Sequence, residues 1–258
     1  EMPMDIMWQQ SEVILGSKTP GSPAPLPDPD QIEKAAKILG KSRQPMIFVG
    51  GGAYEACEEI KILAETLQAP VVSYQNGRGI LDERHHLAHT NTAGAMLWKN
   101  CDAAISIGCR MQAERMSWGM DDAIKIIHID IDPTEINRIM KPDVGLVSDA
   151  AVATKNIINA LKKYNIKRPS REEEMLNLKA RAGKLMEEIA GPQMGWLRAI
   201  RDVLPDNGLF VDEFTQVGYM SRVGFPVYNP RSMITPGYQG TLGYGYATAL
   251  GVKVAHPD

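Results

Sequence analysis

Short apolar runs alternate with helix-forming segments along most of the chain. Continuous apolar stretches occupy residues 45–49, 70–74, 103–108 and 125–130, and a shorter stretch occupies 145–148. Strands that are apolar on both faces belong to parallel sheets that helices cover on both sides. The pattern therefore predicts an α/β fold for residues 30–164, a nucleotide-fold central domain on a doubly wound parallel sheet of about six strands.

The segments between these runs carry helix signals. Asp30 is a candidate N-cap for a helix whose apolar positions share one face, namely Ile32, Ala35, Ala36 and Leu39. Further helices are expected over residues 55–67 and 149–164. The alternation of strand and helix supports βαβ units rather than an antiparallel arrangement.

The first 29 residues differ from the rest. Residues 17–30 hold five prolines, and each proline removes a donor and biases its predecessor away from helix. The chain opens without Met, and residues 1–6 read like the end of a strand that enters a loop. We interpret residues 1–29 as a Pro-rich linker from a preceding domain that is missing here.

The last third predicts a connection and a second unit. Residues 165–190 are charged and helix-favouring, which indicates a connecting helix over another domain's surface. Residues 191–258 then combine a helix with Trp196, Leu197, Ile200 and Leu204 on one face, a strand at 209–211, loops, and a small-residue helix at 240–251. One strand in so short a stretch cannot bury a sufficient core, so we read this unit as a truncated second α/β domain.

Composition narrows the possible functions. The chain of 258 residues has a net charge of -3 and no basic stripe, which argues against a nucleic-acid partner. No apolar run is long enough to cross a bilayer and no signal peptide opens the chain, so a cytoplasmic location without membrane contact is expected. The three cysteines, Cys57, Cys101 and Cys109, lack metal-ligand spacing and predict buried free thiols.

Polar and glycine residues follow several predicted strands, where open sheets bind ligands. Gly50, Gly51 and Gly52 allow either a tight turn or a close approach to a nucleotide, and Asn76 begins a turn of the form Asn-Gly-Arg-Gly. Arg78 in that turn either meets a phosphate or is solvated. Asp130 is a candidate for ribose hydroxyls, whereas Asp132 is a candidate cap of a helix that begins at Pro133.

Two further clusters carry weaker signals. His85, His86 and His89 lie near two acids, which is compatible with a metal, but the polar sequence favours a solvated loop. In the second unit, residues 212–218 follow a strand with short polar groups that can hold a diphosphate, and residues 237–243 form a glycine-lined approach to a helix.

Taken in order, residues 43–52, 76–79, 128–133 and 237–245 resemble the acetolactate synthase-like family of thiamine-diphosphate enzymes. The resemblance implies that the cofactor, with Mg2+, decarboxylates a small 2-oxo acid. The resulting carbanion then either attacks a second carbonyl compound or takes up a proton. It implies that Thr215 and Gln216 contact the diphosphate and that the Gly240 carbonyl accepts from the aminopyrimidine. It also implies that Leu242, after Thr241 in the same turn, bends the cofactor.

The same resemblance implies that essential parts lie elsewhere. The family's catalytic glutamate belongs to a preceding domain, and its magnesium ligands would begin after Asp258, so no catalytic or metal-binding residue is assigned within this chain. We expect this fragment to be inactive alone. In the central domain, Arg110 resembles the family's flavin-contacting arginine, but the acidic pair beside it is replaced by residues 111–114 of different character, which argues against tight FAD binding.

Several alternatives remain open at this point. A non-ligating 2-oxo-acid or acyl-CoA decarboxylase would share the same motifs. A FAD- or NAD-binding module without chemistry would explain the central domain but not residues 239–245. The resemblance also implies a homodimer or homotetramer, in which the central domain is mainly a scaffold.

Overall fold

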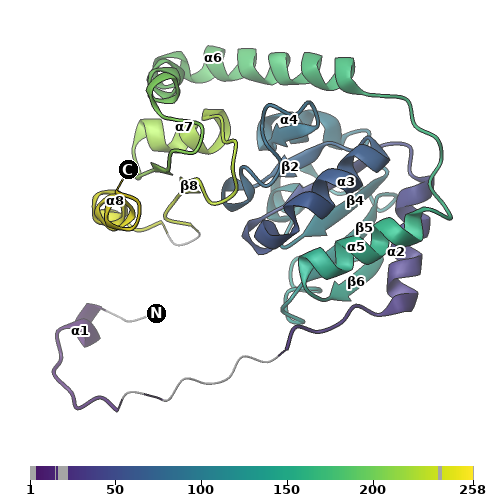
Figure 1. The fold of residues 1–258 in the computed structure, drawn as a ribbon, viewed down its shortest axis with the longest axis horizontal. Coiled ribbons are helices and arrows are strands. Elements are labelled where there is room, and N and C mark those ends of the chain that lie inside the picture. The colour runs from purple at the N-terminus through teal and green to yellow at the C-terminus, as the bar shows by residue number, and fades with distance from the viewer. Residues whose placement is uncertain (1–3, 15, 17–22, 238–239, 258) are drawn as a thin grey trace.

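The computed structural model describes residues 4–14, 16, 23–237 and 240–257. A six-stranded parallel sheet forms the central domain, with the strand order β3-β2-β1-β4-β5-β6 (Figure 1). The strands are β1 (Pro45–Val49), β2 (Val71–Ser73), β3 (Ala88–Thr90), β4 (Ala103–Ile107), β5 (Lys125–Asp130) and β6 (Val144–Val147). The predicted α/β fold with six parallel strands is confirmed.

Strand β3 lies where the sequence favoured a solvated loop. It pairs in parallel with β2, so that His89 lies opposite Val72, and His89 is only 3% exposed. A three-residue strand of which two residues are polar has too little periodicity to be read from sequence. The expectation of a solvated loop is therefore wrong for His89.

Helices cover both faces of the sheet. On one face, α2 (Pro29–Lys41), the 3-10 turn η1 (Gly51–Ala56) with α3 (Cys57–Leu67), and α5 (Ala150–Leu161) bury the side chains of Ile47, Ile105 and Ile127. On the other face, α4 (Asn91–Trp98) and the π-helix η3 (Glu114–Trp118) pack Trp98 and Trp118 around Phe48. This two-sided core explains why the strands are continuously apolar.

Two predicted caps need correction. The α2 helix begins at Pro29, and the Asp28 side chain rather than Asp30 is its N-cap, accepting from the backbone N–H of Asp30. Proline at the first helical position places the start two residues earlier than a cap at Asp30 would. No helix follows Asp132: its carboxylate accepts from the Thr134 N–H and hydroxyl, which closes a turn instead. The Asp149 cap of α5 agrees with the expected start.

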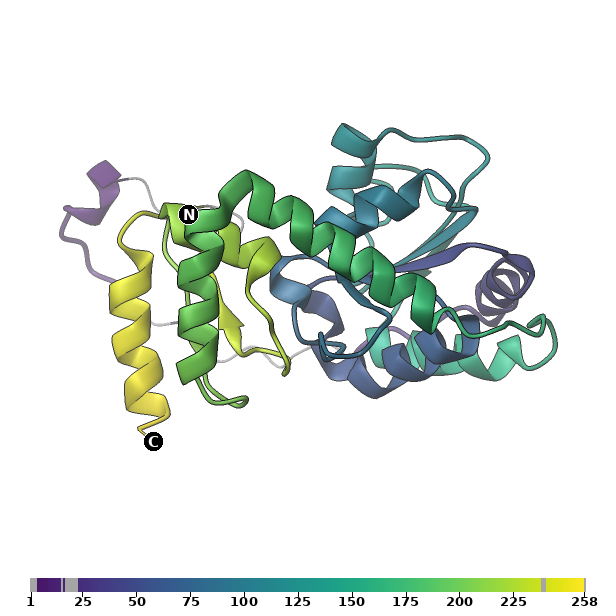
Figure 2. The ribbon, with the colours of Figure 1, turned by 90° about the horizontal axis from the view of Figure 1, so that it is seen from above.

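The connecting segment is one long helix, α6 (Glu172–Val203), which runs from the central domain to the second unit (Figures 1 and 2). It bends at Ala190, whose backbone leaves the helical region just before Pro192. Met175, Leu178 and Met186 are buried along it, whereas Leu176 and Ile189 are exposed. Trp196, predicted on the same helix face as Leu197, is 65% exposed, whereas Leu197 is buried.

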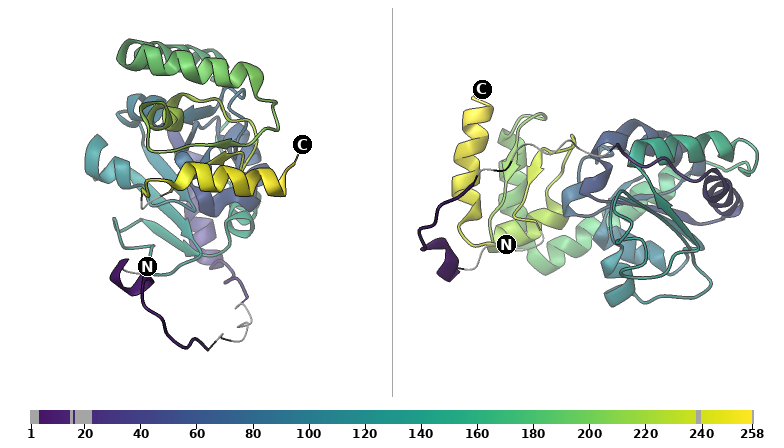
Figure 3. Two further views of the ribbon diagram at one scale, coloured as in Figure 1. Left: turned by 90° about the vertical axis from the view of Figure 1, so that its left-hand side faces the viewer. Right: turned by 90° about the horizontal axis from the view of Figure 1, so that it is seen from below.

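The second unit contains β7 (Phe210–Val211), α7 (Gln216–Gly224), β8 (Met233–Ile234) and α8 (Tyr244–Ala255). The strands β7 and β8 pair in parallel, so the described residues of this unit form two strands rather than the one predicted. In Figures 1 and 3, α7 and β8 lie between α6 and α8. The α8 helix starts at Tyr244 rather than at Gly240, because residues 240–243 form a turn with two glycines of positive φ.

The N-terminal segment extends away from the sheet (Figure 1). Residues 4–7 form one helical turn, α1 (Met4–Met7), so the expected strand end is wrong in the part that is described. Residues 5–14 are exposed, and residues 23–28 continue as an extended connection to α2, as the prolines predicted. A part of the Pro-rich segment, 17–22, lies outside the described residues. Among the described helices, none is long and apolar enough to cross a membrane.

Candidate functional site

A large cavity lies where the strand order reverses. Strands β1 and β4 are neighbours, but the chain continues from β1 toward β2 and β3 on one side and from β4 toward β5 and β6 on the other. The cavity, of about 730 Å³, opens at the carboxyl ends of these strands. Open parallel sheets bind their ligands at such a switch point.

The five residues predicted for a nucleotide all line this cavity. They lie at the carboxyl ends of four strands. Gly51 and Gly52 follow β1, Asn76 follows β2, Arg110 follows β4, and Asp130 ends β5. Gly52 and Gly108 let two loops touch, since a Cβ on Gly52 would lie 2.8 Å from the Gly108 Cα, and Gly108 has a φ of +57°. A side chain at either position would force these two loops apart.

One wall of the cavity is acidic. Asp130, Asp132 and Glu135 line it, and the Arg110 Nε donates to a Glu135 carboxylate oxygen at 3.0 Å. Burial raises the pKa of Glu135, but hydrogen bonds from Arg138 and Arg110 outweigh it and hold the pKa below its usual value. Carboxylates at this edge accept hydrogen bonds from sugar hydroxyls, which suits a nucleoside.

The second unit also reaches the cavity, which the sequence did not reveal. Arg222 and Val223, near the end of α7, complete the lining. The Arg222 Nε lies 3.3 Å from an Asp212 carboxylate oxygen, and its guanidinium lies 4.7 Å from the centre of the Phe214 ring. A basic residue on a short helix carries no sequence signal for contact with a distant sheet.

A buried carboxyl lies behind the cavity wall. The Tyr74 hydroxyl donates to Glu114, which sits in the π-helix η3 and is fully buried. Burial raises the pKa of Glu114 to about 7, against the smaller lowering effect of the Tyr74 hydrogen bond. Nearby, burial raises the pKa of the Cys109 thiol to about 12. Cys101 and Cys109 are buried free thiols as predicted, while Cys57 is only partly buried.

Arg78 neither lines the cavity wall nor is solvated, in contrast to both readings of its sequence. Its side chain is 1% exposed and forms a two-pronged ion pair with Glu83. It also donates to the backbone carbonyls of Ser221, Arg222 and Phe225 at the end of α7. Arg78 therefore clamps the central domain to the second unit.

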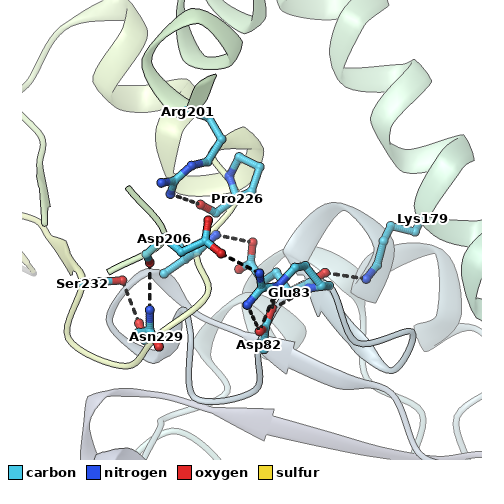
Figure 4. Close-up of polar contacts among 10 residues, drawn as sticks. Asp82, Glu83, Lys179, Arg201, Asp206, Pro226, Asn229 and Ser232 are labelled. Carbon is cyan, nitrogen blue, oxygen red and sulfur yellow. Dashed lines mark hydrogen bonds and ion pairs between the residues drawn. The ribbon is translucent and has the colours of Figure 1, made fainter. Parts of the chain in front are cut away.

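Further contacts surround this clamp (Figure 4). Glu83 accepts from the Val227 N–H at 3.0 Å, and Lys179 of α6 donates to the Glu83 backbone carbonyl at 2.8 Å. Arg201 reaches the Pro226 carbonyl from the second half of α6. Three segments distant in sequence thus meet at Glu83.

The histidine cluster does not form a metal centre. Burial lowers the pKa of His89 to about 3, which keeps it neutral, while His85 hydrogen-bonds to Glu65. Within the described ranges, no group of three or more His, Cys, Asp or Glu side chains could hold a metal ion.

The residues predicted for thiamine diphosphate form a second group, in the second unit. Thr215 caps α7, its hydroxyl accepting from the Gly218 N–H at 3.0 Å, and Gln216 follows on the exposed surface. Gly240 has a φ of +65°, and a Cβ there would lie 2.8 Å from the Phe214 ring. Thr241 and Leu242 are exposed, Leu242 by 79%. The structure brings the two predicted segments together, and Gly237 at the start of the second one accepts from the cavity-lining Gln75 side chain at 3.1 Å.

Comparison with known families matches both groups of residues. The family model for the "Thiamine pyrophosphate enzyme, central domain" matches residues 32–161, which contain the sheet and its cavity. The model for the "Thiamine pyrophosphate enzyme, C-terminal TPP binding domain" matches residues 215–258, which begin at Thr215. The chain belongs to the thiamine pyrophosphate enzyme family. Thiamine pyrophosphate is another name for thiamine diphosphate, so the resemblance read from the motifs is confirmed.

Relatives within this family carry one recurring name. The chain is 31% identical over 266 residues to a probable acetolactate synthase large subunit of Methanococcus aeolicus, covering 92% of this chain and 44% of the relative. It is 32% identical over 249 residues to the protein of that name in Methanocaldococcus jannaschii, covering 89% and 42%. The acetolactate synthase large subunit of Corynebacterium glutamicum is 29% identical over 274 residues, covering 99% and 43%. The chain thus spans less than half the length of these relatives.

Proposed function

We propose that this chain is part of a thiamine-diphosphate-dependent enzyme that decarboxylates a small 2-oxo acid and ligates the product to a second carbonyl compound. The observation that carries the proposal is the contact between the two cofactor segments, residues 212–218 and 240–245. The contact joins residues 213 and 214, just before the region that matches the C-terminal TPP binding domain, to a turn within that region. The recurrent acetolactate synthase relatives support the reaction class.

The residues of the second unit fit the predicted cofactor. The start of α7 leaves backbone N–H groups that suit a diphosphate, and the Thr215 hydroxyl lies there. Gly240 keeps the turn close to Phe214, where a side chain would clash, so the backbone carbonyls of that turn can approach an aminopyrimidine. When bound, the cofactor supplies an electron sink for the carbanion left by decarboxylation. Leu242, exposed at the tip of the turn, would support the bent form of the cofactor.

We propose that the chain alone does not catalyse. The resemblance implies that the catalytic glutamate and the magnesium ligands lie in other segments of the protein, and the matched relatives are more than twice as long as this chain. An assay of the purified 258-residue chain that detects thiamine-diphosphate-dependent turnover would contradict this proposal.

We propose that the central cavity holds a nucleotide. Its glycine-lined loops, its acidic wall and its place at the switch point fit an adenine nucleotide. Residues 111–114 depart from the flavin pattern, and Arg110 is already hydrogen-bonded to Glu135, so we expect FAD to bind weakly. Calorimetric titration with ADP and with FAD compares the two directly, and tighter binding of FAD would overturn this choice.

We propose a homodimer or homotetramer in the cytoplasm. Tyr246, Leu250 and Val254 follow one another at helical spacing on α8 and are 78%, 52% and 85% exposed, which is apolar area that a second protein surface would bury. The three free cysteines are typical of a reducing compartment.

The reaction is tested on the protein that carries this chain at its natural length. Pyruvate, as the simplest 2-oxo acid, is supplied with thiamine diphosphate and Mg2+, and carbon dioxide and organic products are measured. The proposal predicts carbon dioxide release that stops without thiamine diphosphate, together with a ligated product. Release of acetaldehyde alone would favour simple decarboxylation, and turnover that ignores the cofactor would refute the proposal.

A further inference from the structure

Glu213 lies between the two segments predicted to bind the cofactor. One of its carboxylate oxygens accepts from the Gly245 N–H at 2.7 Å, and the other accepts from the Phe214 N–H at 2.8 Å. Gly245 belongs to the first turn of α8, which is 32 residues further along the chain. A single side chain therefore joins the strand end that precedes α7 to the start of α8.

The start of α8 needs such a partner. Its N-cap is Gly243, which has no side chain to accept from the first helical N–H groups. The Gly245, Phe214 and Gly243 N–H groups hold the pKa of Glu213 below its ordinary value, and a carboxylate is favoured at the positive end of a helix. Glu213 thus supplies the cap that the local sequence of α8 lacks.

The turn of residues 240–245 packs closely against residues 213 and 214. A Cβ on Gly245 would lie 2.8 Å from the Glu213 Cβ, and a Cβ on Gly240 would lie 2.8 Å from the Phe214 ring. Both glycines let the turn of residues 240–245 rest directly on residues 213 and 214. The carboxylate faces N–H donors of the protein, and a free carboxylate would repel a diphosphate, so direct ligand contact does not explain its place.

We propose that Glu213 is a positioning residue that holds the turn of residues 240–245 against the start of α7. It would thereby fix Leu242 relative to Thr215 and Gln216. The inference rests on the proposed function, because its consequence is the geometry of bound thiamine diphosphate. The proposed role predicts that the length of the side chain at position 213 matters more than its charge, because the side chain must extend as far as the Gly245 N–H.

Three substitutions at position 213, made in the natural-length protein, separate the effect of side-chain length from the effect of side-chain charge. Glu213→Ala removes the joint and is expected to weaken thiamine diphosphate binding by about ten-fold, the size of a lost helix cap with its misplacement of the turn. Glu213→Asp keeps the charge but is one methylene shorter, so it should resemble Ala. Glu213→Gln keeps the length and one acceptor, so it should stay within about three-fold of wild type. Glu173→Ala, an exposed acid at the start of α6, is the matched control.

Two readouts accompany the titrations. Hydrogen exchange at the Gly245 amide, measured on the 258-residue chain, should speed up in the Ala and Asp variants but not in Gln, while near-ultraviolet circular dichroism of the bound cofactor reports its bent form. If wild type fails to bind thiamine diphosphate, the proposed function falls. If wild type binds and the Ala variant matches it, or if Asp rescues and Gln does not, the positioning role is refuted. Equal loss in all three variants with unchanged exchange at Gly245 would indicate direct ligand contact and would also overturn it.

Discussion

Replacement of Arg78 by Met tests whether the central domain and the second unit are held together by one buried clamp. Met fills a similar length without charge, so Glu83 would keep a carboxylate that is only 12% exposed while losing its ionic partner. Three backbone carbonyls at the end of α7 would also lose a donor. Breaking a buried ion pair by removing one member costs about 3–5 kcal/mol.

The control is Arg84→Met, six residues further along. Arg84 also joins the two units, through Asp206, but its side chain is 57% exposed and that of Asp206 is 66% exposed. Exposed pairs contribute about 0–1 kcal/mol, so this variant should unfold like wild type. The two arginines therefore differ in burial rather than in the domains that they connect.

Urea unfolding is followed by tryptophan fluorescence, to which the buried Trp98 contributes, and by far-ultraviolet circular dichroism. We expect Arg78→Met to lower the unfolding free energy by about 3–5 kcal/mol and to separate the transitions seen by the two probes. Arg78→Met with Glu83→Gln should lose less than the sum of the single changes, because no unpaired charge remains. A loss below about 1 kcal/mol for Arg78→Met, or an equal loss for Arg84→Met, would refute the clamp.

Three further predictions follow from the buried and exposed groups of the two sites. Because the pKa of Glu114 is about 7 in the folded chain against a usual 4.5, the folded state binds more protons between these values, and stability falls as pH rises through that window. Glu114→Gln keeps an acceptor for Tyr74 and should remove this loss of stability, which is on the order of 3 kcal/mol. Thermal melts would show this as a smaller difference in melting temperature between pH 5 and pH 8 than in wild type. Leu242→Ala should change the stability of the chain by less than about 0.5 kcal/mol, since the side chain is 79% exposed, yet lower thiamine-dependent turnover of the natural-length protein at least about ten-fold; equal turnover would contradict its role. Asp130→Asn should weaken ADP binding in the cavity by about ten-fold in a calorimetric titration, with Asp121→Asn as an exposed control, and unchanged affinity would remove Asp130 from the site.

The sequence predicts the central sheet well because its strands are apolar on both faces. Residues 45–49 and 103–107 are completely buried, and Ser106 is the single polar residue of the two runs, which leaves few alternatives in a globular domain. Strand β3 was not predicted, because three residues are too few to show a strand's alternating pattern. Its burial comes from pairing with β2 rather than from its own composition. Whether so short a segment forms a strand depends on the sheet that it joins rather than on its own sequence.

The candidate sites divide in the same way. Gly51, Gly52, Asn76, Arg110 and Asp130 follow strands, so the shared carboxyl edge of a parallel sheet brings them together without further information. The roles of Arg78 and Arg222 depend on how α7 packs against the central domain, which no local pattern encodes. Glu213 was hidden for a similar reason, because its partner Gly245 is 32 residues away and offers only a backbone N–H.

The central claim is that residues 213–218 and 240–245 together receive thiamine diphosphate. Calorimetric titration of the natural-length protein with thiamine diphosphate and Mg2+, repeated with thiamine and with a Thr215→Val variant, tests it most directly. The account predicts tight binding of thiamine diphosphate, much weaker binding of thiamine, and a loss of about ten-fold on removing the Thr215 hydroxyl. Equal affinity for thiamine and thiamine diphosphate, or no binding of either, would contradict the claim.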